Sequence, residues 1–349
     1  MKKFRNIKIE KLPASTVEIT GEIESSYLEE EFVKSLKKIA GNLEISGFRK
    51  GHVPEQVALQ KFGEMNVLED AAEEVLQAQY PSIIESEKLS VIGNPKVTLR
   101  KLARNNPLEF SIVVAIVPEL TLPNYTSLAK KNNTLEEVIA TQEEVDAVIL
   151  EIRKHHAHDE MHKNGTFTDH NHAPIEEKDL PELTPEIIKT LGDFTDKEDL
   201  EKKIRENIII DKQKRAKEKR RLAILDAIMN ETEVEIPEVL VESELDKMMA
   251  QFEDDVARAG IPFEDYIKNI GKERSQMRVE WRETAVKKAK VQLILNKIAD
   301  KEKITPDGDA IRNEAEKILM VYKDADPLRV RVYVGMMMTN EKVLEFLEN

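Results

Sequence analysis

The chain has 349 residues, of which 34% are charged and 5% aromatic, and its net charge is −14. Because single cores stop growing near about 250–300 residues, this length predicts two or three domains, and the composition is typical of long, solvent-washed helices. The chain has no cysteine, which excludes disulfides and thiolate metal sites, and it has no apolar run long enough to span a membrane, so we expect a cytoplasmic protein.

The acidic charge is concentrated in the second part of the chain. Residues 1–130 hold 17 Lys and Arg against 18 Asp and Glu, whereas residues 131–349 hold 36 against 49. The first part is therefore the expected neighbour of a nucleic acid. Any docking of this acidic chain to a nucleoprotein has to be local and confined to a small surface.

Residues 1–117 are predicted to form an α+β domain. Apolar and polar side chains alternate at 17–20 and at 110–116, which indicates strands near both ends of the domain. The turn residues 105–107 stand between two strand-like runs, so we expect the second strand to belong to a hairpin.

Three helices are expected between these strands. Ser26 and Glu29 have the spacing of a capping box, which predicts a helix ending at Gly41. A second helix is expected at 54–63, with Pro at its start and Gly at its end, and a third at about 67–88.

The middle of the chain is predicted to be irregular at first and then helical. Prolines and an Asn pair interrupt the periodicity at 118–140, which indicates an extended connector. Residues 141–183 combine a helix with a His-rich segment that is expected to break it. The predicted apolar stripe of this helix is Val145, Val148, Ile149 and Ile152.

Residues 184–349 are predicted to form an all-α domain. Pro and Gly residues separate its apolar-periodic segments. The expected helices are 195–230, 237–259, 263–270, 272–303, 307–322 and 327–348.

The loop after the first predicted helix combines an aromatic residue with two cations. It reads Gly47-Phe48-Arg49-Lys50-Gly51-His52-Val53-Pro54. The cations can neutralise phosphate, the ring can anchor on an apolar surface, and the glycines let the backbone turn sharply. On residue types alone, a solvated turn whose Phe lies in the core is the more frequent arrangement.

A family resemblance changes this interpretation. GFRKGHVP is similar to the G-F-R-x-G-x-x-P signature of trigger factor, a family of bacterial chaperones that sit over the ribosomal exit tunnel, and EQVALQKFG continues the similarity. KDLPELTPEIIKTLGDF, EVEIPEVLVESELDKMMAQF and TNEKVLEFLEN resemble its C-terminal domain, so the resemblance covers about 1–152 and 178–349. It implies an α+β ribosome-binding domain and an all-α chaperone domain with helical arms.

The resemblance also assigns roles to the loop. Phe48, Arg49 and Lys50 are implied to dock on protein and rRNA of the large subunit. The implied loop-shaping residues are Gly47, Gly51 and Pro54. His52 stands where the family commonly has Lys, so we expect weaker or more pH-sensitive docking. Relatives can dimerise, so a homodimer off the ribosome is allowed.

The family's enzyme domain has no room in this chain. Trigger factors normally insert an FKBP-like prolyl-isomerase domain after the helix predicted at about 141–163. A domain of that type needs on the order of 100 residues, and only a short, polar, His-rich stretch occupies the place. We expect no isomerase, no catalytic residue and no cofactor, since no phosphate loop, nucleophile elbow or dinucleotide fingerprint is present.

Six of the seven histidines lie in 155–172: His155, His156, His158, His162, His170 and His172. His158 and His162 are four residues apart, a spacing that suits Zn or Ni on one helix face, but HDEMH lacks the first Glu of the zinc-protease motif. A solvated loop is the favoured interpretation. Weak metal binding through His155, His158 and His162 is the alternative.

Two further features are ambiguous. The basic run 212–221 could contact RNA, but a solvated helix face is favoured. Eight of the 11 methionines follow residue 228, and their flexible thioethers suit either core filling or varied apolar clients. The client-binding candidates are Met248, Met249, Met277, Met320, Met336 and Met337.

Together these features predict an ATP-independent chaperone that docks at the exit tunnel and holds nascent polypeptides on apolar helical surfaces. The expected partners are the large ribosomal subunit and unfolded chains, with no membrane. Three alternatives stay open: a ribosome-independent holdase or assembly factor, a metal-binding chaperone, and a prolyl isomerase.

Overall fold

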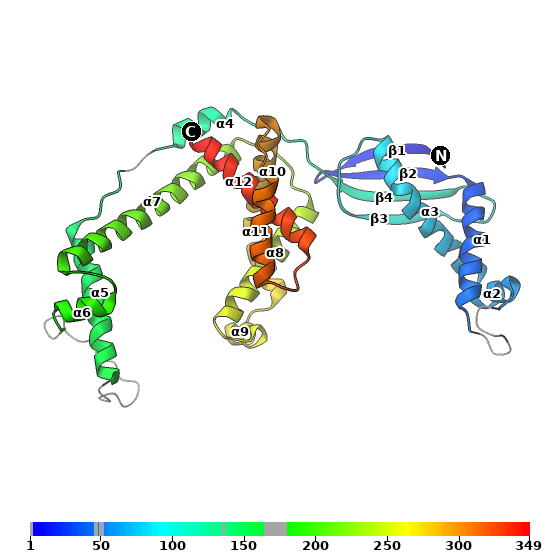
Figure 1. The fold of residues 1–349 in the computed structure, drawn as a ribbon. Helices are drawn as coiled ribbons and strands as arrows, with labels where there is room; N and C mark the ends of the chain where they lie inside the picture. Colours follow the sequence, from blue (N-terminus) through cyan, green and yellow to red (C-terminus); the bar gives the residue numbers. More distant parts are fainter. Residues whose placement is uncertain (1–2, 45–47, 49–51, 135–136, 164–179) are drawn as a thin grey trace. The chain divides into compact units, whose positions relative to one another are not determined.

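The computed structural model describes residues 3–44, 48, 52–134, 137–163 and 180–349, except for the side chains of 160–163 (Figure 1). The chain divides into two units. The first contains Met1–Leu122 and Thr232–Glu302, and the second contains Pro123–Glu231 and Lys303–Asn349.

The N-terminal part of the first unit is built on a four-stranded antiparallel sheet in the order β1-β2-β4-β3. The strands are β1 (Phe4–Leu12), β2 (Thr16–Ile23), β3 (Val91–Lys101) and β4 (Leu108–Ile116). The predicted β3–β4 hairpin is confirmed. β1 was not predicted, because most side chains of this edge strand are exposed and its apolar pattern is weak.

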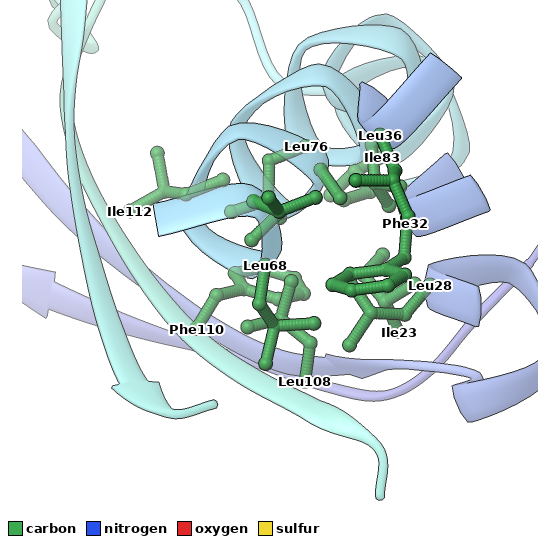
Figure 2. Packing of buried hydrophobic residues seen from close by; sticks show 14 of the residues in the cluster. Ile23, Leu28, Phe32, Leu36, Leu68, Leu76, Ile83, Leu108, Phe110 and Ile112 are labelled. Atoms are coloured by element: carbon green, nitrogen blue, oxygen red, sulfur yellow. The ribbon is translucent and has the colours of Figure 1, made fainter. Parts of the chain in front are cut away.

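Three helices follow β2, namely α1 (Ser25–Asn42), α2 (Glu55–Phe62) and α3 (Glu64–Ser86). Side chains of α1, α3, β2 and β4 meet in one core (Figure 2). Its members include Ile23, Leu28, Phe32, Leu36, Leu68, Leu76, Ile83, Leu108, Phe110 and Ile112. Gly21 pairs with Phe110 across the sheet, and a Cβ at Gly21 would lie 2.9 Å from the ring. The ring therefore occupies the space that a larger residue would need.

The predicted capping box is wrong. α1 begins at Ser25 and its N-cap, Glu24, makes no side-chain cap hydrogen bond. Glu29 instead accepts hydrogen bonds from the Arg104 guanidinium at 2.7 and 2.8 Å and from the Asn105 backbone N–H at 3.0 Å. The Arg104 hydrogen bonds lower the pKa of Glu29. A bidentate ion pair is stronger than a cap hydrogen bond, and here it ties α1 to the β3–β4 turn.

The rest of the first unit is a helical hairpin of α8 (Glu238–Arg258) and α10 (Arg274–Glu302), with the short α9 (Phe263–Ile270) between them. Val241, Leu245 and Ala285 form its core. Arginines on α10 recur every four residues, so they lie on one face and pair with carboxylates on α8. These pairs are Arg274–Glu253, Arg278–Glu242, Arg278–Asp246 and Arg282–Glu238.

The second unit is entirely helical in its described part. Its helices are α4 (Tyr125–Asn132), α5 (Gln142–Lys163), α6 (Pro185–Leu191), α7 (Lys197–Asn230), α11 (Gly308–Val321) and α12 (Pro327–Glu348). α5 and α6 pack on α7 around a core of Val145, Ile188, Leu200 and Ile204. α11 and α12 pack on each other through Ala315, Val330 and Val334. The predicted all-α architecture is confirmed.

Two local expectations for residues 118–152 differ from the structure. α4 is helical where an extended connector was predicted, because Asn124 caps the Ser127 N–H and Tyr125 is buried. Val148 is exposed, although Val145, Ile149 and Ile152 form the apolar stripe as predicted. α5 ends at Lys163, in agreement with the helix expected at about 141–163, so the first part of the His-rich segment is helical.

Candidate functional site

The loop between α1 and α2 is held at both ends by the N-terminal core. Leu43 packs against this core immediately after α1, and Val53 belongs to it with 6% of its surface exposed. At the other end of the loop Pro54 is the N-cap of α2, and its carbonyl accepts hydrogen bonds from Val57 and Ala58 at 3.0 Å. The loop is therefore anchored on a rigid scaffold.

Phe48 lies between these anchors with 42% of its surface exposed. The alternative in which its ring is buried in the core is therefore wrong. His52 is also exposed. The remaining loop candidates, Gly47, Arg49, Lys50 and Gly51, lie outside the described residues.

The six methionine candidates divide by burial. Met249 and Met277 are buried, with 7% and 4% exposed, and Met248 packs against the core of the α8–α10 hairpin. Met320 and Met337 are 73% and 50% exposed. Met336 is half-buried. Residue type alone did not separate core methionines from surface ones.

The α11–α12 hairpin exposes an apolar surface that the methionines only partly indicated. Seven large apolar side chains between residues 320 and 337, at the end of α11 and in the first half of α12, are at least half exposed. We call them the hairpin surface: Met320, Val321, Tyr322, Leu328, Val332, Tyr333 and Met337. The signal in the sequence is PLRVRVYVGMMM at the start of α12, which has more apolar positions than one packed stripe can bury.

Two family profiles match most of the chain. Residues 5–152 match the bacterial trigger factor protein (TF), and residues 197–347 match the bacterial trigger factor protein (TF) C-terminus. The chain belongs to the trigger factor family. It is a ribosome-associated chaperone, and the two matches correspond to the α+β and helical parts of the fold.

Curated relatives named trigger factor align along nearly the whole chain. The protein of Halothermothrix orenii is 26% identical over 404 aligned positions, which cover 94% of this chain and 93% of the relative. That of Clostridium kluyveri is 22% identical and covers 98% of both chains. A solved structure titled "Promiscuous Substrate Recognition in Folding and Assembly Activities of the Trigger Factor Chaperone" shares the fold, with a TM-score of 0.54, 16% identity and 99% coverage of both chains.

The chain is short between the two regions that match the family. The alignment with the Halothermothrix protein is longer than the 349 residues of the chain, so that relative has segments with no counterpart here. Residues 153–196 lie between the two matched regions. This interval is much shorter than a compact domain of about 100 residues.

The His-rich segment provides no metal site within the described residues, where no group of three or more His, Asp or Glu side chains is placed to hold an ion. His155 and His158 are exposed on α5, and His156 is half-buried. The side chain of His162 and the residues His170 and His172 lie outside the described part. Within that same part, no helix is both long and apolar enough to cross a bilayer.

The basic run on α7 is largely engaged within the second unit. Lys212 binds the Glu144 carboxylate at 2.5 Å. Arg220 and Arg221 each lie 3.1 Å from the Glu348 carboxylate near the end of α12. Lys217 lies 3.8 Å from the same group. These pairs favour the structural interpretation of the run over an RNA-binding one.

Glu348 is the centre of this cluster, with only 9% of its side chain exposed. Burial disfavours its charged form, but hydrogen bonds from Arg221 and Arg220 outweigh that effect and lower its pKa. A carboxyl with a lowered pKa stabilises the fold above its unfolded pKa of about 4.3, and the contribution is lost as the pH falls through the folded value.

Replacing Glu348 by Gln should therefore weaken the packing of α12 on α7 by about 1–3 kcal/mol at pH 7, because the half-buried Arg220 loses this charged partner and Arg221 keeps only Glu341. The difference from the unmodified chain should shrink as the pH falls below the unfolded pKa of about 4.3 and toward the lowered pKa of Glu348 in the folded chain. Hydrogen exchange of α12 amides at several pH values measures both effects. Glu345→Gln, which changes an exposed carboxyl on the same helix, is the control, and equal protection in the two variants at pH 7 would contradict the assignment.

Proposed function

We propose that the chain docks beside the exit tunnel of the large ribosomal subunit through the loop 47–54 and holds nascent polypeptides without using ATP. The proposed docking is supported by the exposed side chain of Phe48, which lies on a loop whose two ends are fixed in the core. A large apolar ring presented on a rigid scaffold loses little conformational freedom on binding.

Each loop residue has a role in this proposal. The ring of Phe48 enters an apolar pocket of a ribosomal protein, which is the usual form of an interface hot spot. Arg49 and Lys50 contact the phosphates of rRNA. The loop-shaping residues are Gly47, Gly51 and Pro54. His52 lacks the permanent charge of a Lys, so docking through this loop is weaker than with a Lys at the same position.

Alanine at Phe48, Arg49 and Lys50 together should weaken binding to ribosomes at least about tenfold, because an aromatic anchor and two phosphate contacts are removed. Co-sedimentation of the full chain with purified ribosomes at fixed salt measures the effect. The matched control is Lys8→Ala/Ile9→Ala/Lys11→Ala, which removes two cations and one exposed apolar side chain from β1. Unchanged co-sedimentation of the loop variant would instead support a ribosome-independent holdase.

Clients bind on the hairpin surface in our proposal, with Met320 and Met337 as its adaptable members. The support is that seven apolar residues that are at least half exposed fall within the short stretch 320–337, since scattered single residues would be ordinary. The flexible, unbranched side chains of methionine can adapt to apolar client segments of varied shape. Contacts of this kind are weak and distributed, so release needs only that the client buries its own apolar segments.

Ser at both Met320 and Met337 should reduce the affinity for an unfolded client about three- to tenfold, because apolar contact area is lost without disturbing a core. The concentration needed to suppress aggregation of a denatured protein measures this change. Met65→Ser alters a methionine on α3 that is 54% exposed, and it should leave suppression unchanged. If Met65→Ser had the same effect as the hairpin pair, the client surface would be misplaced.

Met249→Ser and Met277→Ser change buried methionines instead of exposed ones. Both side chains are buried, so these changes should cost about 2–5 kcal/mol of local stability in the α8–α10 hairpin. Any loss of client holding in these variants should therefore follow unfolding of that hairpin, as seen by circular dichroism.

We further propose that the chain has no prolyl-isomerase activity and acts by binding alone. The support is the short interval between the two family matches. The slow, proline-limited phase of a refolding client should keep its uncatalysed rate at any concentration of the chain. An FKBP-type isomerase added to the same assay is the positive control, and acceleration by the chain itself would overturn this part of the proposal.

The proposal places the chain in the cytoplasm, where ribosomes and nascent chains are available. A homodimer off the ribosome is consistent with the exposed hairpin surface, which a second copy could cover. Metal binding is not part of the proposed function, since among the described residues no group of three or more His, Asp or Glu side chains is placed to hold an ion.

A further inference from the structure

The N-terminal domain contains a cavity between α3 and the edge strand β3, apart from the docking loop and the hairpin surface. Its volume is about 460 Å³, and residues of α3, β3 and β4 line it. Cavities of about 300–1,000 Å³ with mostly apolar walls and a few polar groups are typical of small-molecule sites. The size of this cavity is therefore that of a ligand site.

Both buried and exposed apolar side chains line the cavity. Leu76 on α3 and Ile112 on β4 belong to the domain core and are 3% and 1% exposed (Figure 2). On β3 the wall consists of the alternate residues Pro95, Val97 and Leu99, and Val97 is 44% exposed. An apolar molecule in the cavity would remove water from side chains that the fold leaves partly exposed, which favours binding.

The position of β3 in the sheet explains why this space is not filled by the domain itself. β3 is the last strand in the sheet order, so in the described part of the chain it pairs on one side only. Its pairing with β4 is irregular between Ile92 and Lys96, and Pro95 within this stretch has no N–H for the ladder. Val97 and Leu99 therefore lack the side chains that a further strand would pack beside them.

The charge of the cavity wall is negative. Among the described residues that line the cavity only Glu73 is charged, and its helix α3 contains no Lys or Arg. Side chains alternate along a strand, so Arg100 lies on the other face of the sheet, where it pairs with Glu18 at 2.5 Å. Burial raises the pKa of Tyr80, so this phenol in the wall stays uncharged near neutral pH. Such a wall attracts an amine and repels a carboxylate.

We propose that this cavity binds a small molecule that has an apolar body, such as an aromatic ring, and an amine at one end. The body lies between Leu76, Val97 and Leu99, and the ammonium group lies at Glu73. The amide of Gln77, one helical turn after Glu73, can accept a second hydrogen bond from the ammonium. This site uses none of the residues assigned to ribosome docking or client holding, so it goes beyond the proposed function.

Three probes with the same naphthalene ring test the ligand class: naphthylmethylamine, naphthalenemethanol and naphthoate. Each is titrated into the full chain with labelled Leu and Val methyl groups, and the methyl NMR signals of Val97 and Leu99 report binding at the cavity. The amine should bind about two- to fivefold more tightly than the alcohol, and the carboxylate more weakly than both, because Glu73 is an exposed carboxylate. The unfolding temperature of the domain should rise with the concentration of the amine.

Two pairs of variants identify the responsible residues. Val97→Phe adds a ring to an exposed wall of the cavity and should weaken all three probes at least about fivefold. Ile9→Phe, on the other edge strand where Ile9 is 38% exposed, should leave binding unchanged. Glu73→Gln should remove the difference between the amine and the alcohol. Glu74→Gln removes the same charge from a carboxylate that pairs with Lys38 at 3.0 Å, and it should keep the difference.

Dispersed methyl signals in each variant check that the domain remains folded. Equal weakening by Ile9→Phe and Val97→Phe, or signal shifts confined to Leu328 on α12, would overturn the site. Naphthoate binding as tightly as the amine would overturn the ligand class. Displacement of the amine from the Val97 methyl groups by an unfolded protein would reassign the cavity to clients. The first two results leave ribosome docking and client holding on the hairpin surface unaffected.

Discussion

A helix that packs on its neighbour along a single stripe leaves the rest of its circumference facing outward. α12 shows the consequence most clearly. Val330 and Val334 pack against α11, whereas Leu328 and Val332 remain 71% and 67% exposed. In the proposed function this exposed apolar area of α12 receives client segments, which requires neither an enclosed pocket nor a source of energy.

The N-terminal domain differs from the α11–α12 hairpin because its helices and sheet pack into one core. Its sheet and helices share one apolar core, and the Glu29–Arg104 pair ties α1 to the β3–β4 turn. In the proposed docking, the fixed ends of the loop 47–54 mean that Phe48 reaches a large partner without ordering of the loop ends on contact. The proposal thus assigns docking to the loop of the α+β domain and client holding to the exposed apolar surface of α12.

Much of this arrangement was predictable from the sequence, because Pro and Gly mark helix ends regardless of tertiary contacts. The helices at 263–270 and 327–348 were predicted to the residue. Local patterns gave wrong predictions where a residue distant in sequence makes the stronger contact. Glu29 has the spacing of a capping-box residue, but its carboxylate binds the Arg104 guanidinium instead. Burial of a methionine is likewise set by packing, so Met249 and Met337 could not be told apart by type.

In the proposed function one molecule docks on the ribosome through the loop 47–54 and holds the emerging chain on α12. A photo-cross-linking amino acid at Val332, used with ribosomes that carry a stalled nascent chain, tests both halves at once. We expect cross-links to the nascent chain when the loop is intact and their loss when Phe48, Arg49 and Lys50 are alanine. Cross-links that persist undiminished in the loop variant would contradict ribosome docking as the source of client capture.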